Sequence, residues 1–407
     1  TADATRLSEI LGAPNPGAAI TITPKSITEI VEVMKRASES GSSVVPAGAQ
    51  TWLKSSNQRN GNLVISTLGL NRIVEHEPAD LVATAEAGVS LSTFNRELAR
   101  NGQWLPLDPP DNGAATLGGV VATGLAGPRQ FGYGPPRRYV IGMRVVLADG
   151  TQIKVGGRVV KNVAGYDLCK LFTGSYGTLG IISEITFKLR PVPETSATLL
   201  ATGTLTSLLK AGQALMTSAL FPVAIEILSA AIVAELELNG TAEHALLIQF
   251  AGTQAGVAQQ VERAVSTIRR DFATANVMTL EAPSSVWRSI AASETGHEQL
   301  SWRGGIQPGK LAEVVCHLTG RWNAGVGSGI VSGDFEGNLE EAIRLQQRMR
   351  SLGGWLTIQN SPAELDRIGD EGDPGIMRLM QRIKSELDPR GVFPGLGRQA
   401  SRLPQSP

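Results

Sequence analysis

The chain of 407 residues is 42% hydrophobic and 18% charged, so it can bury large cores, and we expect two domains or one domain with a large insertion. Its 37 basic and 37 acidic residues give a formal net charge of zero, which excludes the basic excess typical of proteins that bind nucleic acid or anionic membranes. No apolar run approaches the roughly 20 residues of a membrane-spanning helix, and the first residues lack a signal-peptide pattern, so we expect no direct membrane insertion.

The first predicted element is a helix that starts from Thr23 as its N-cap, with Pro24 at the first helical position. Apolar residues then recur at helical spacing, and Gly41 ends the helix. Two short strands are predicted next, one at Ser43–Val45 and one at Leu63–Ser66.

A strand is then predicted at Leu81–Ala87, followed by a short helix capped by Ser90. Further along, Val140–Leu147 and Gln152–Val155 read as two strands of a hairpin, because Asp149-Gly150 is a strong turn signal. Alternating apolar residues predict one more half-buried strand at Ile185–Leu189, and two prolines close this part of the chain.

From about Thr195 the pattern changes to alternating strands and helices, for which an antiparallel sheet with helices on one face is the expected packing. The predicted elements are strands at Ala224–Leu228, Ala245–Ala251, Gly329–Phe335 and Trp355–Gln359, and helices at Gln254–Arg270, Leu339–Leu352 and Gly375–Leu387.

Three separated runs of small residues stand out against this background: Pro46–Trp52 (PAGAQTW), the long segment Asp108–Gly142, and Lys161–Ile182. In each run glycines alternate with branched residues, as expected where bare main chain approaches a flat or anionic ligand while the same segment packs into a core. A turn such as PAGAQTW can also aim successive amide groups at a diphosphate. Together the three runs predict a cofactor cradle.

These runs resemble the FAD-binding domain of the vanillyl-alcohol oxidase/p-cresol methylhydroxylase family, most specifically in TLGGVVATGLAGPR and VVKNVAGYDLCKLFTGSYGTLGIISEI. Within that family they resemble the GlcE-type FAD-binding subunits of bacterial glycolate oxidase. The match is close from Ile20 to Pro193 and looser to Gly397. It implies an α+β fold with a bipartite PCMH-type FAD-binding domain and an antiparallel cap or substrate domain.

The resemblance and the change in pattern together predict four segments. Residues 1–193 form the FAD domain, in two subdomains divided near 75–80, and residues 194–335 form the cap. Residues 336–398 return to the FAD domain, and residues 399–407 are a tail.

The resemblance implies non-covalent FAD, because Ala49 and Gln50 stand where covalent members of the family carry a histidine. It also implies a set of residues that contact FAD through exposed main chain and small side chains. These are Pro46, Ala47, Gly48, Ala49, Gln50, Thr51, Trp52, Pro109, Thr116, Gly118, Gly119, Ala122, Thr123, Gly124, Gly127, Gly134, Gly180, Ile181 and Ile182.

The sequence departs from the family pattern at three places. Arg138 replaces the usual Asp of G-x-x-R-D, Tyr176 replaces the Glu of GSEGTLG, and the closing DPRGVFPG lacks an Asn. Lys161 is a candidate cation near the flavin pyrimidine, where it would stabilise the reduced form; a helix-capping or ion-pairing role is an equal alternative.

Other motifs fail on inspection. In the P-loop-like Gly304–Lys310, Leu311 stands where Ser or Thr would hold magnesium, and HEQLS at His297 lacks the second histidine of a zinc site. The four histidines are scattered, so we expect no metal, unlike the catalytic subunit of glycolate oxidase. Trp287-Arg288 and Trp302-Arg303 could clamp a substrate carboxylate, with Arg303 the candidate we retain, but tryptophan in the core with arginine at its rim is the favoured reading.

The resemblance therefore implies an FAD-dependent oxidoreductase acting on CH–OH groups, as the FAD-binding subunit of a glycolate oxidase complex that oxidises glycolate to glyoxylate. Its partners would be a catalytic FAD subunit and an iron–sulfur subunit, since this chain has two cysteines and no cluster motif. The cysteines lie in apolar stretches and favour a cytoplasmic location, with peripheral attachment to the inner membrane through partners. The alternatives are a stand-alone FAD-dependent 2-hydroxyacid or alcohol oxidoreductase and a flavin-bearing structural subunit.

Overall fold

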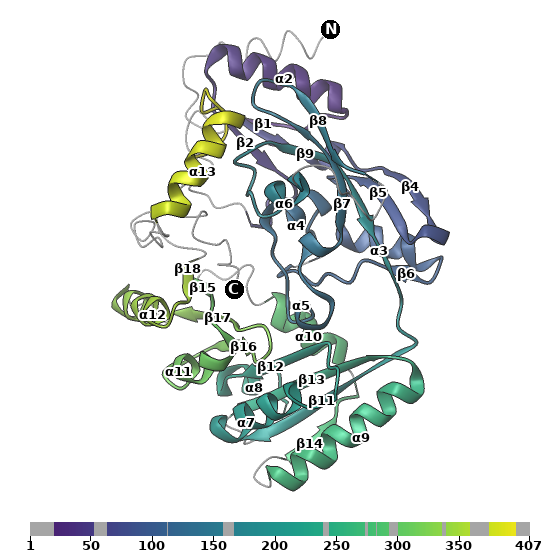
Figure 1. Cartoon of the computed structure of the whole chain (residues 1–407), viewed down its shortest axis with the longest axis vertical. Helices are drawn as coiled ribbons and strands as arrows, with labels where there is room; N and C mark the ends of the chain where they lie inside the picture. Colours follow the sequence, from purple (N-terminus) through teal and green to yellow (C-terminus); the bar gives the residue numbers. More distant parts are fainter. Residues whose placement is uncertain are drawn as a thin grey trace.

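A computed structural model describes residues 20–52, 63–111, 113–157, 167–238, 244–272, 276–281, 283–292, 300–335, 339–358 and 374–395. Within this part of the chain, three sheets of three or more strands form the framework of the molecule (Figure 1), beside one two-stranded pair. Two of the sheets lie in the first half of the chain, and the third is formed by strands from Thr195 onward. Figure 1 shows the third sheet apart from the other two, with the short helix α5 (Gln130–Tyr133) between them.

The first sheet is small and parallel, with strand order β1-β3-β2. Its strands are β1 (Ile20–Ile22), β2 (Val44–Ala47) and β3 (Leu63–Ser66). Helix α2 (Ile27–Ser40) packs on it through Ile30, Met34 and other buried side chains. Because β2 and β3 are parallel, their carboxyl ends meet at one edge of the sheet, and the segments that follow both strands leave the sheet there.

The predicted start of α2 at Thr23 was wrong. Ser26 is the N-cap, and its hydroxyl accepts from the Glu29 amide at 3.2 Å while the Glu29 carboxylate accepts from the Lys25 amide at 2.8 Å. This reciprocal arrangement satisfies two amides at the helix start, whereas Pro24 lies before the helix. The predicted end is confirmed, since Gly41 caps the helix with φ +69°.

The second sheet is antiparallel, with strand order β4-β5-β9-β7-β8. The hairpin predicted at Asp149-Gly150 is confirmed: Gly150 has φ +83° and its amide donates to the Leu147 carbonyl. The sheet is formed by β4 (Ile73–Glu77), β5 (Val82–Glu86), β7 (Val140–Val146), β8 (Gln152–Gly156) and β9 (Ile181–Lys188). Its core also takes in α3 (Leu91–Ala99), α4 (Leu117–Thr123) and α6 (Leu168–Phe172), while β6 (Gln103–Trp104) pairs with β10 (Arg190–Pro191).

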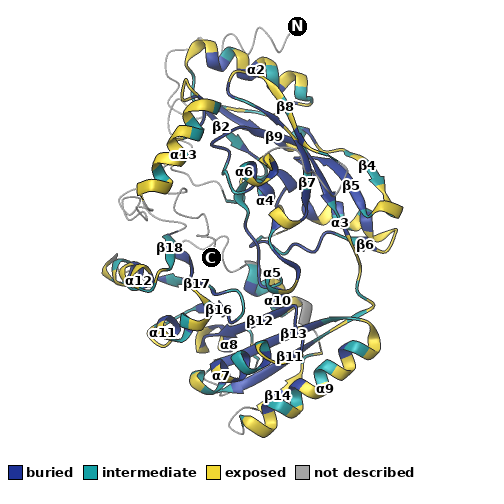
Figure 2. Ribbon diagram, viewed as in Figure 1, coloured by how far each residue is buried: buried dark blue, intermediate teal, exposed yellow. Residues whose placement is uncertain are grey.

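The third sheet has eight antiparallel strands in the order β14-β11-β13-β12-β16-β17-β15-β18. Figure 2 shows its central strands buried along most of their length, because both faces are covered. The strands are β11 (Thr195–Gly203), β12 (Ala224–Leu228), β13 (His244–Gly252), β14 (Asn276–Thr279), β15 (Leu300–Gly305), β16 (Trp322–Gly325), β17 (Ile330–Phe335) and β18 (Trp355–Ile358).

Our expectation of helices on one face of this sheet was wrong. Helices α7 (Leu205–Met216), α9 (Gln254–Asp271), α11 (Leu311–Val315) and α12 (Leu339–Ser351) cover one face, and α8 (Ala230–Glu235) and α10 (Pro283–Ala292) cover the other. The physical reason is visible in β13, where Leu246 and Leu247 point to opposite faces and both are fully buried.

The C-terminal part of the described chain divides between the sheets. Strand β18 pairs with β15, so the predicted return segment remains with the third sheet as far as Ile358. Helix α13 (Pro374–Leu387) instead approaches the first half of the chain: Lys384 donates to the Thr178 carbonyl at 2.7 Å. Beyond it, the Val44 amide donates to the Val392 carbonyl at 2.8 Å, and Val392 and Phe393 complete the core beside the first sheet.

Helix α5 joins the two halves. The Gly132 amide donates to the Val223 carbonyl at 3.1 Å, and Arg129, at the N-cap of α5, donates to the Gln249 side chain at 3.0 Å. Phe131 packs so closely over Gly327 that a Cβ there would lie 2.2 Å from its ring. These contacts hold the third sheet at a defined distance from the second.

Candidate functional site

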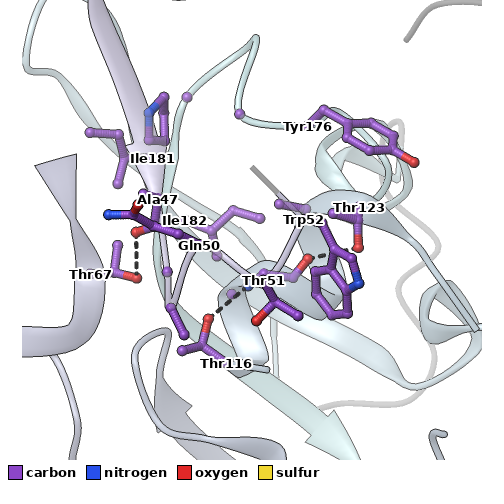
Figure 3. Close-up of a pocket in the computed structure, with 18 residues that line it drawn as sticks. Ala47, Gln50, Thr51, Trp52, Thr67, Thr116, Thr123, Tyr176, Ile181 and Ile182 are labelled. Carbon is purple, nitrogen blue, oxygen red and sulfur yellow. Dashed lines mark hydrogen bonds between the residues drawn. The ribbon is translucent and has the colours of Figure 1, made fainter. Parts of the chain in front are cut away.

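A pocket lies where the carboxyl ends of β2 and β3 face helix α4 and the loop that enters β9 (Figure 3). It contains about 760 Å³ of space not filled by protein atoms, the open solvent at its mouth included. The residues that line it are small or uncharged: Pro46, Ala47, Gly48, Ala49, Gln50, Thr51, Trp52, Thr67, Thr116, Gly118, Gly119, Ala122, Thr123, Tyr176, Gly177, Gly180, Ile181 and Ile182.

The three runs of small residues touch one another in this pocket. A Cβ on Gly48 would lie 2.2 Å from the Thr116 hydroxyl oxygen, although the two residues are far apart in sequence. On the other side, a Cβ on Gly177 would lie 3.1 Å from the Pro46 ring, and Gly177 also needs φ +71°. Glycine is therefore required at both junctions because the main chain of one run packs against a side chain of another.

Helix α4 is positioned by its own caps and by strand β5. The Thr116 hydroxyl accepts from the Gly119 amide at 3.2 Å, and Gly124 ends the helix with φ +64°. The Gly118 amide donates to the Ala87 carbonyl at 2.8 Å, and a Cβ on Gly118 would lie 2.8 Å from the Ala87 side chain. The helix thus lies directly on the end of β5, leaving Gly119 to face the pocket.

Both ends of the Pro46–Trp52 loop are held by side-chain hydrogen bonds. Thr67 donates to the Ala47 carbonyl at 3.2 Å, and the Trp52 indole donates to the Pro110 carbonyl at 2.7 Å. The Trp52 ring also lies 3.4 Å from a Cβ built on Gly119. The indole therefore forms one wall of the pocket.

Two pocket residues have an unusual backbone conformation. Gln50 (φ +61°) and Tyr176 (φ +54°) are left-handed, a region that residues other than glycine rarely occupy. Such strain concentrates at ligand sites, where the surrounding structure holds it. Between them in the pocket, the buried Thr51 hydroxyl has no hydrogen-bond partner among the described residues.

The structure brings most of the predicted cofactor residues together. One pocket is lined by the predicted residues from Pro46 to Trp52, from Thr116 to Thr123 and from Gly180 to Ile182. Pro109, Gly124, Gly127 and Gly134 do not line it. Gly127 instead packs on the Asp108 main chain, and Gly134 ends α5 with φ +91°.

Three lining residues were missed. Gly177 lies within the quoted segment VVKNVAGYDLCKLFTGSYGTLGIISEI, and Tyr176 was noted only as a departure from the family pattern. Thr67 follows β3 at the edge where parallel strands end, so strand pairing, and not local sequence, is the signal that could have found it.

A second, larger cleft adjoins this pocket and lies between the two halves of the chain. It contains about 1370 Å³ and shares Thr123 and Tyr176 with the first pocket. Arg137 and Lys170 line it from the first half and Arg303 from β15 of the third sheet. No acidic side chain is among the described residues that line it.

Arg303 is the inner cation of this cleft. It is only 4% exposed, and its guanidinium donates to the Ala126 carbonyl at 2.6 Å, across the boundary between the two halves. Arg288 does not line the cleft, and Trp287 is buried on the far face of the third sheet, where its indole donates to Thr198 at 3.0 Å.

A polar chain runs along the same boundary. The Asp108 carboxylate accepts from the Arg129 amide at 2.9 Å, and the Arg129 guanidinium donates to Gln249. Burial raises the pKa of Asp108 from 3.8 to about 6, against the opposing effects of the Arg129 charge and backbone hydrogen bonds. This carboxyl group therefore changes charge near neutral pH.

The remaining candidates lie away from both cavities. His76 bonds to Gln103 at 3.0 Å, His244 packs beside Trp322, and His317 is exposed. Lys161 and His297 lie outside the described residues. Within the described part of the chain, no group of three or more His, Cys, Asp or Glu side chains is placed to hold a metal, and no helix is long and apolar enough to cross a membrane.

The first pocket fits a flavin dinucleotide. Its lining carries no charge, so a diphosphate there would be held by main-chain amides and by hydroxyls such as that of Thr51, which has no protein partner. Gly119 keeps the pocket wall beside Trp52 free of a side chain.

Comparison with known proteins agrees with an FAD site in the first pocket. Residues 18–156 match the family model of an FAD binding domain. The chain is 32% identical to glycolate oxidase subunit GlcD of Bacillus subtilis over 91% of this chain and 87% of that protein. It is 48% identical to subunit GlcE of Escherichia coli, but over 31% of this chain and 37% of that protein, and 27% identical to a mitochondrial D-lactate dehydrogenase of Arabidopsis thaliana over 92% and 72%.

Solved structures show the same fold. p-Cresol methylhydroxylase superposes with a TM-score of 0.72 over 93% of this chain and 88% of that one, at 16% identity. Alkyldihydroxyacetonephosphate synthase gives 0.67 over 91% and 76%, at 17% identity. The PCMH-type α+β fold is thereby confirmed, whereas the narrower resemblance to GlcE covers too little of either chain to decide the subunit. From the GlcD match across nearly its full length, the chain belongs to the family of FAD-binding oxidoreductases that includes GlcD, and FAD is its cofactor.

Proposed function

We propose that this chain oxidises the CH–OH group of a small 2-hydroxy acid with non-covalently bound FAD. One observation carries the proposal: the uncharged FAD pocket adjoins, at Thr123 and Tyr176, a cleft that presents cations and, among its described lining residues, no acid. A substrate carboxylate is attracted to such a cleft, and its reacting carbon then lies near the shared edge.

The named relatives support this chemistry. They include D-lactate dehydrogenases and D-2-hydroxyglutarate dehydrogenases as well as the glycolate oxidase subunits. The substrates in these names are all 2-hydroxy acids with a carboxylate beside the reacting carbon.

The chain's own residues bind and orient. Bound FAD would supply the two-electron acceptor for oxidation of the substrate carbon. Arg303 is placed to orient a carboxylate, because its guanidinium lies buried at the cleft wall and is held there by the Ala126 carbonyl. Phe131 and Trp355 line the same cleft and exclude water beside the reacting carbon.

The narrower proposal is the FAD-binding, GlcE-type subunit of a glycolate oxidase complex, which converts glycolate to glyoxylate. The 48% identity to GlcE over 128 residues supports it. With two cysteines, this chain cannot supply four thiolates to an iron–sulfur cluster, so electrons would leave to an iron–sulfur subunit beside a catalytic FAD subunit. We place this complex in the cytoplasm, attached peripherally to the inner membrane through its partners.

A stand-alone 2-hydroxyacid oxidoreductase is the second candidate. The match to a D-lactate dehydrogenase over 92% of this chain and 72% of that protein favours it, as does the position of both cavities within one chain.

Anaerobic mixing of the purified, FAD-loaded chain with glycolate and lactate distinguishes the two, with a co-expressed complex beside it. Loss of oxidised-flavin absorbance only in the complex supports the subunit, and loss at a competent rate in the isolated chain supports the stand-alone enzyme. If neither preparation is reduced by any 2-hydroxy acid, the flavin is structural and the proposed function is wrong.

A further inference from the structure

The cations of the second cleft, which lies between the two halves of the chain, fall into two groups that differ in exposure. Arg303 is buried at the wall formed by β15, whereas Arg137 and Lys170 are exposed at the mouth, on the first half of the chain. A substrate with a single carboxylate needs only one of these two groups of cations to bind it. From this division we infer that the preferred substrate is a 2-hydroxy acid with a second anionic group: its first carboxylate meets Arg303, and its second meets Arg137 and Lys170.

Neither cation at the mouth is strongly engaged by the protein. Arg137, on the short helix η4 (Pro136–Arg138), makes no ion pair or side-chain hydrogen bond with another described residue. Lys170 on α6 has one ion pair, with Asp167 at 3.2 Å, and both of those side chains are more than half exposed. Exposed pairs of this kind contribute little, so a ligand anion can compete for Lys170.

The walls of the cleft suit a substrate longer than two carbons. Phe131 and Trp355 line it and contribute apolar rings. A short methylene chain that joins two carboxylates would lie on these rings. The inference rests on the broader proposed function, oxidation of a 2-hydroxy acid, which it narrows to dicarboxylic acids; it opposes glycolate as the preferred substrate.

The test compares substrates of one and two carboxylates with the FAD-loaded chain or, if only the complex is active, with the complex. Glycolate and lactate are the first class, and both enantiomers of malate and 2-hydroxyglutarate are the second. We expect a higher kcat/KM for at least one dicarboxylate. Arg137→Gln and Lys170→Gln should each lower the kcat/KM of that dicarboxylate about tenfold, the effect of one charge-assisted hydrogen bond, and should lower that of lactate less.

Arg138→Gln is the matched control. It removes the same charge from the neighbouring residue, which does not line the cleft. A higher kcat/KM for monocarboxylates, or equal losses in the Arg137 and Arg138 variants, overturns the inference.

A binding measurement separates this inference from the proposed function. Calorimetric titration with glutarate, which carries no hydroxyl group, should show tighter binding than propionate and a weakening of about tenfold in Arg137→Gln. If glutarate binds more tightly than propionate and Arg137→Gln weakens it, while no 2-hydroxy acid reduces the flavin, the proposed oxidation is wrong and the proposed site for a second carboxylate is supported. If hydroxy acids reduce the flavin but glutarate binds no better than propionate, the dianion site is wrong.

Discussion

The contact between Gly48 and Thr116 offers a direct measure of whether two distant runs meet in the FAD pocket. In Gly48→Ala the new methyl would lie 2.2 Å from the Thr116 hydroxyl oxygen, more than 1 Å inside ordinary contact, and we expect a loss of about 1–3 kcal/mol in the free energy of unfolding. Thr116→Ala removes the N-cap of α4 and should cost about 1 kcal/mol.

The double variant decides the argument. With the hydroxyl gone, the nearest remaining atom to the new methyl is the Cβ of residue 116, at 3.3 Å, so most of the overlap disappears. We therefore expect the double variant to be nearly as stable as Thr116→Ala alone, a coupling of about 1–2 kcal/mol measured by urea unfolding with and without excess FAD. Gly309→Ala, where nothing lies within 4 Å of the new methyl, is the control. Additivity within about 0.5 kcal/mol would refute the contact.

Three further predictions concern the pocket, the C-terminal anchor and pH. Gly119→Val should weaken FAD binding at least about tenfold by fluorescence titration, with unchanged circular dichroism, because its methyls would enter the space beside Trp52; full flavin retention would contradict this. Lys384→Met should cost about 3–5 kcal/mol in urea unfolding because it leaves the fully buried Asp388 carboxylate without its cation, and Lys384→Met with Asp388→Asn should recover part of that loss; a cost below about 1 kcal/mol would show that the pair is dispensable. Since burial raises the pKa of Asp108 from 3.8 to about 6, its contribution to stability is fully present below pH 4 and is lost as pH rises through 6; Asp108→Asn should lack this slope, and identical pH profiles of unfolding would contradict it.

Much of the fold followed from local sequence. Ser90 and Gly41 cap helices as predicted, and Asp149-Gly150 turns the hairpin, because caps and tight turns are satisfied by residues adjacent in the chain. Strand β1 was missed because three residues carry no periodicity, and its partner β3 lies about 40 residues away. Coverage of both faces of the third sheet depends on where α8 and α10 pack, which is a tertiary property.

The glycines of the sequence predicted the pocket, and they also caused the errors in its predicted lining. Gly48, Gly118 and Gly119 lie where main chain packs or faces the cavity, and the sequence correctly marked all three runs. Gly127 and Gly134 have the same local appearance, but one packs on Asp108 and the other ends α5. Composition alone cannot separate a glycine that contacts a ligand from one that lets two protein segments approach.

The hydrogen bond from Val44 to Val392 has a consequence for biosynthesis. Strands β1 to β3 are made early, yet the core beneath α2 is completed by Val392 and Phe393, which are among the last described residues to leave the ribosome. The nascent N-terminal unit must therefore wait, with part of its apolar surface uncovered, while the third sheet is synthesised and folds. Docking of the final segment is then expected to be a late step of maturation, and the half-finished chain is the species for which a chaperone would matter most.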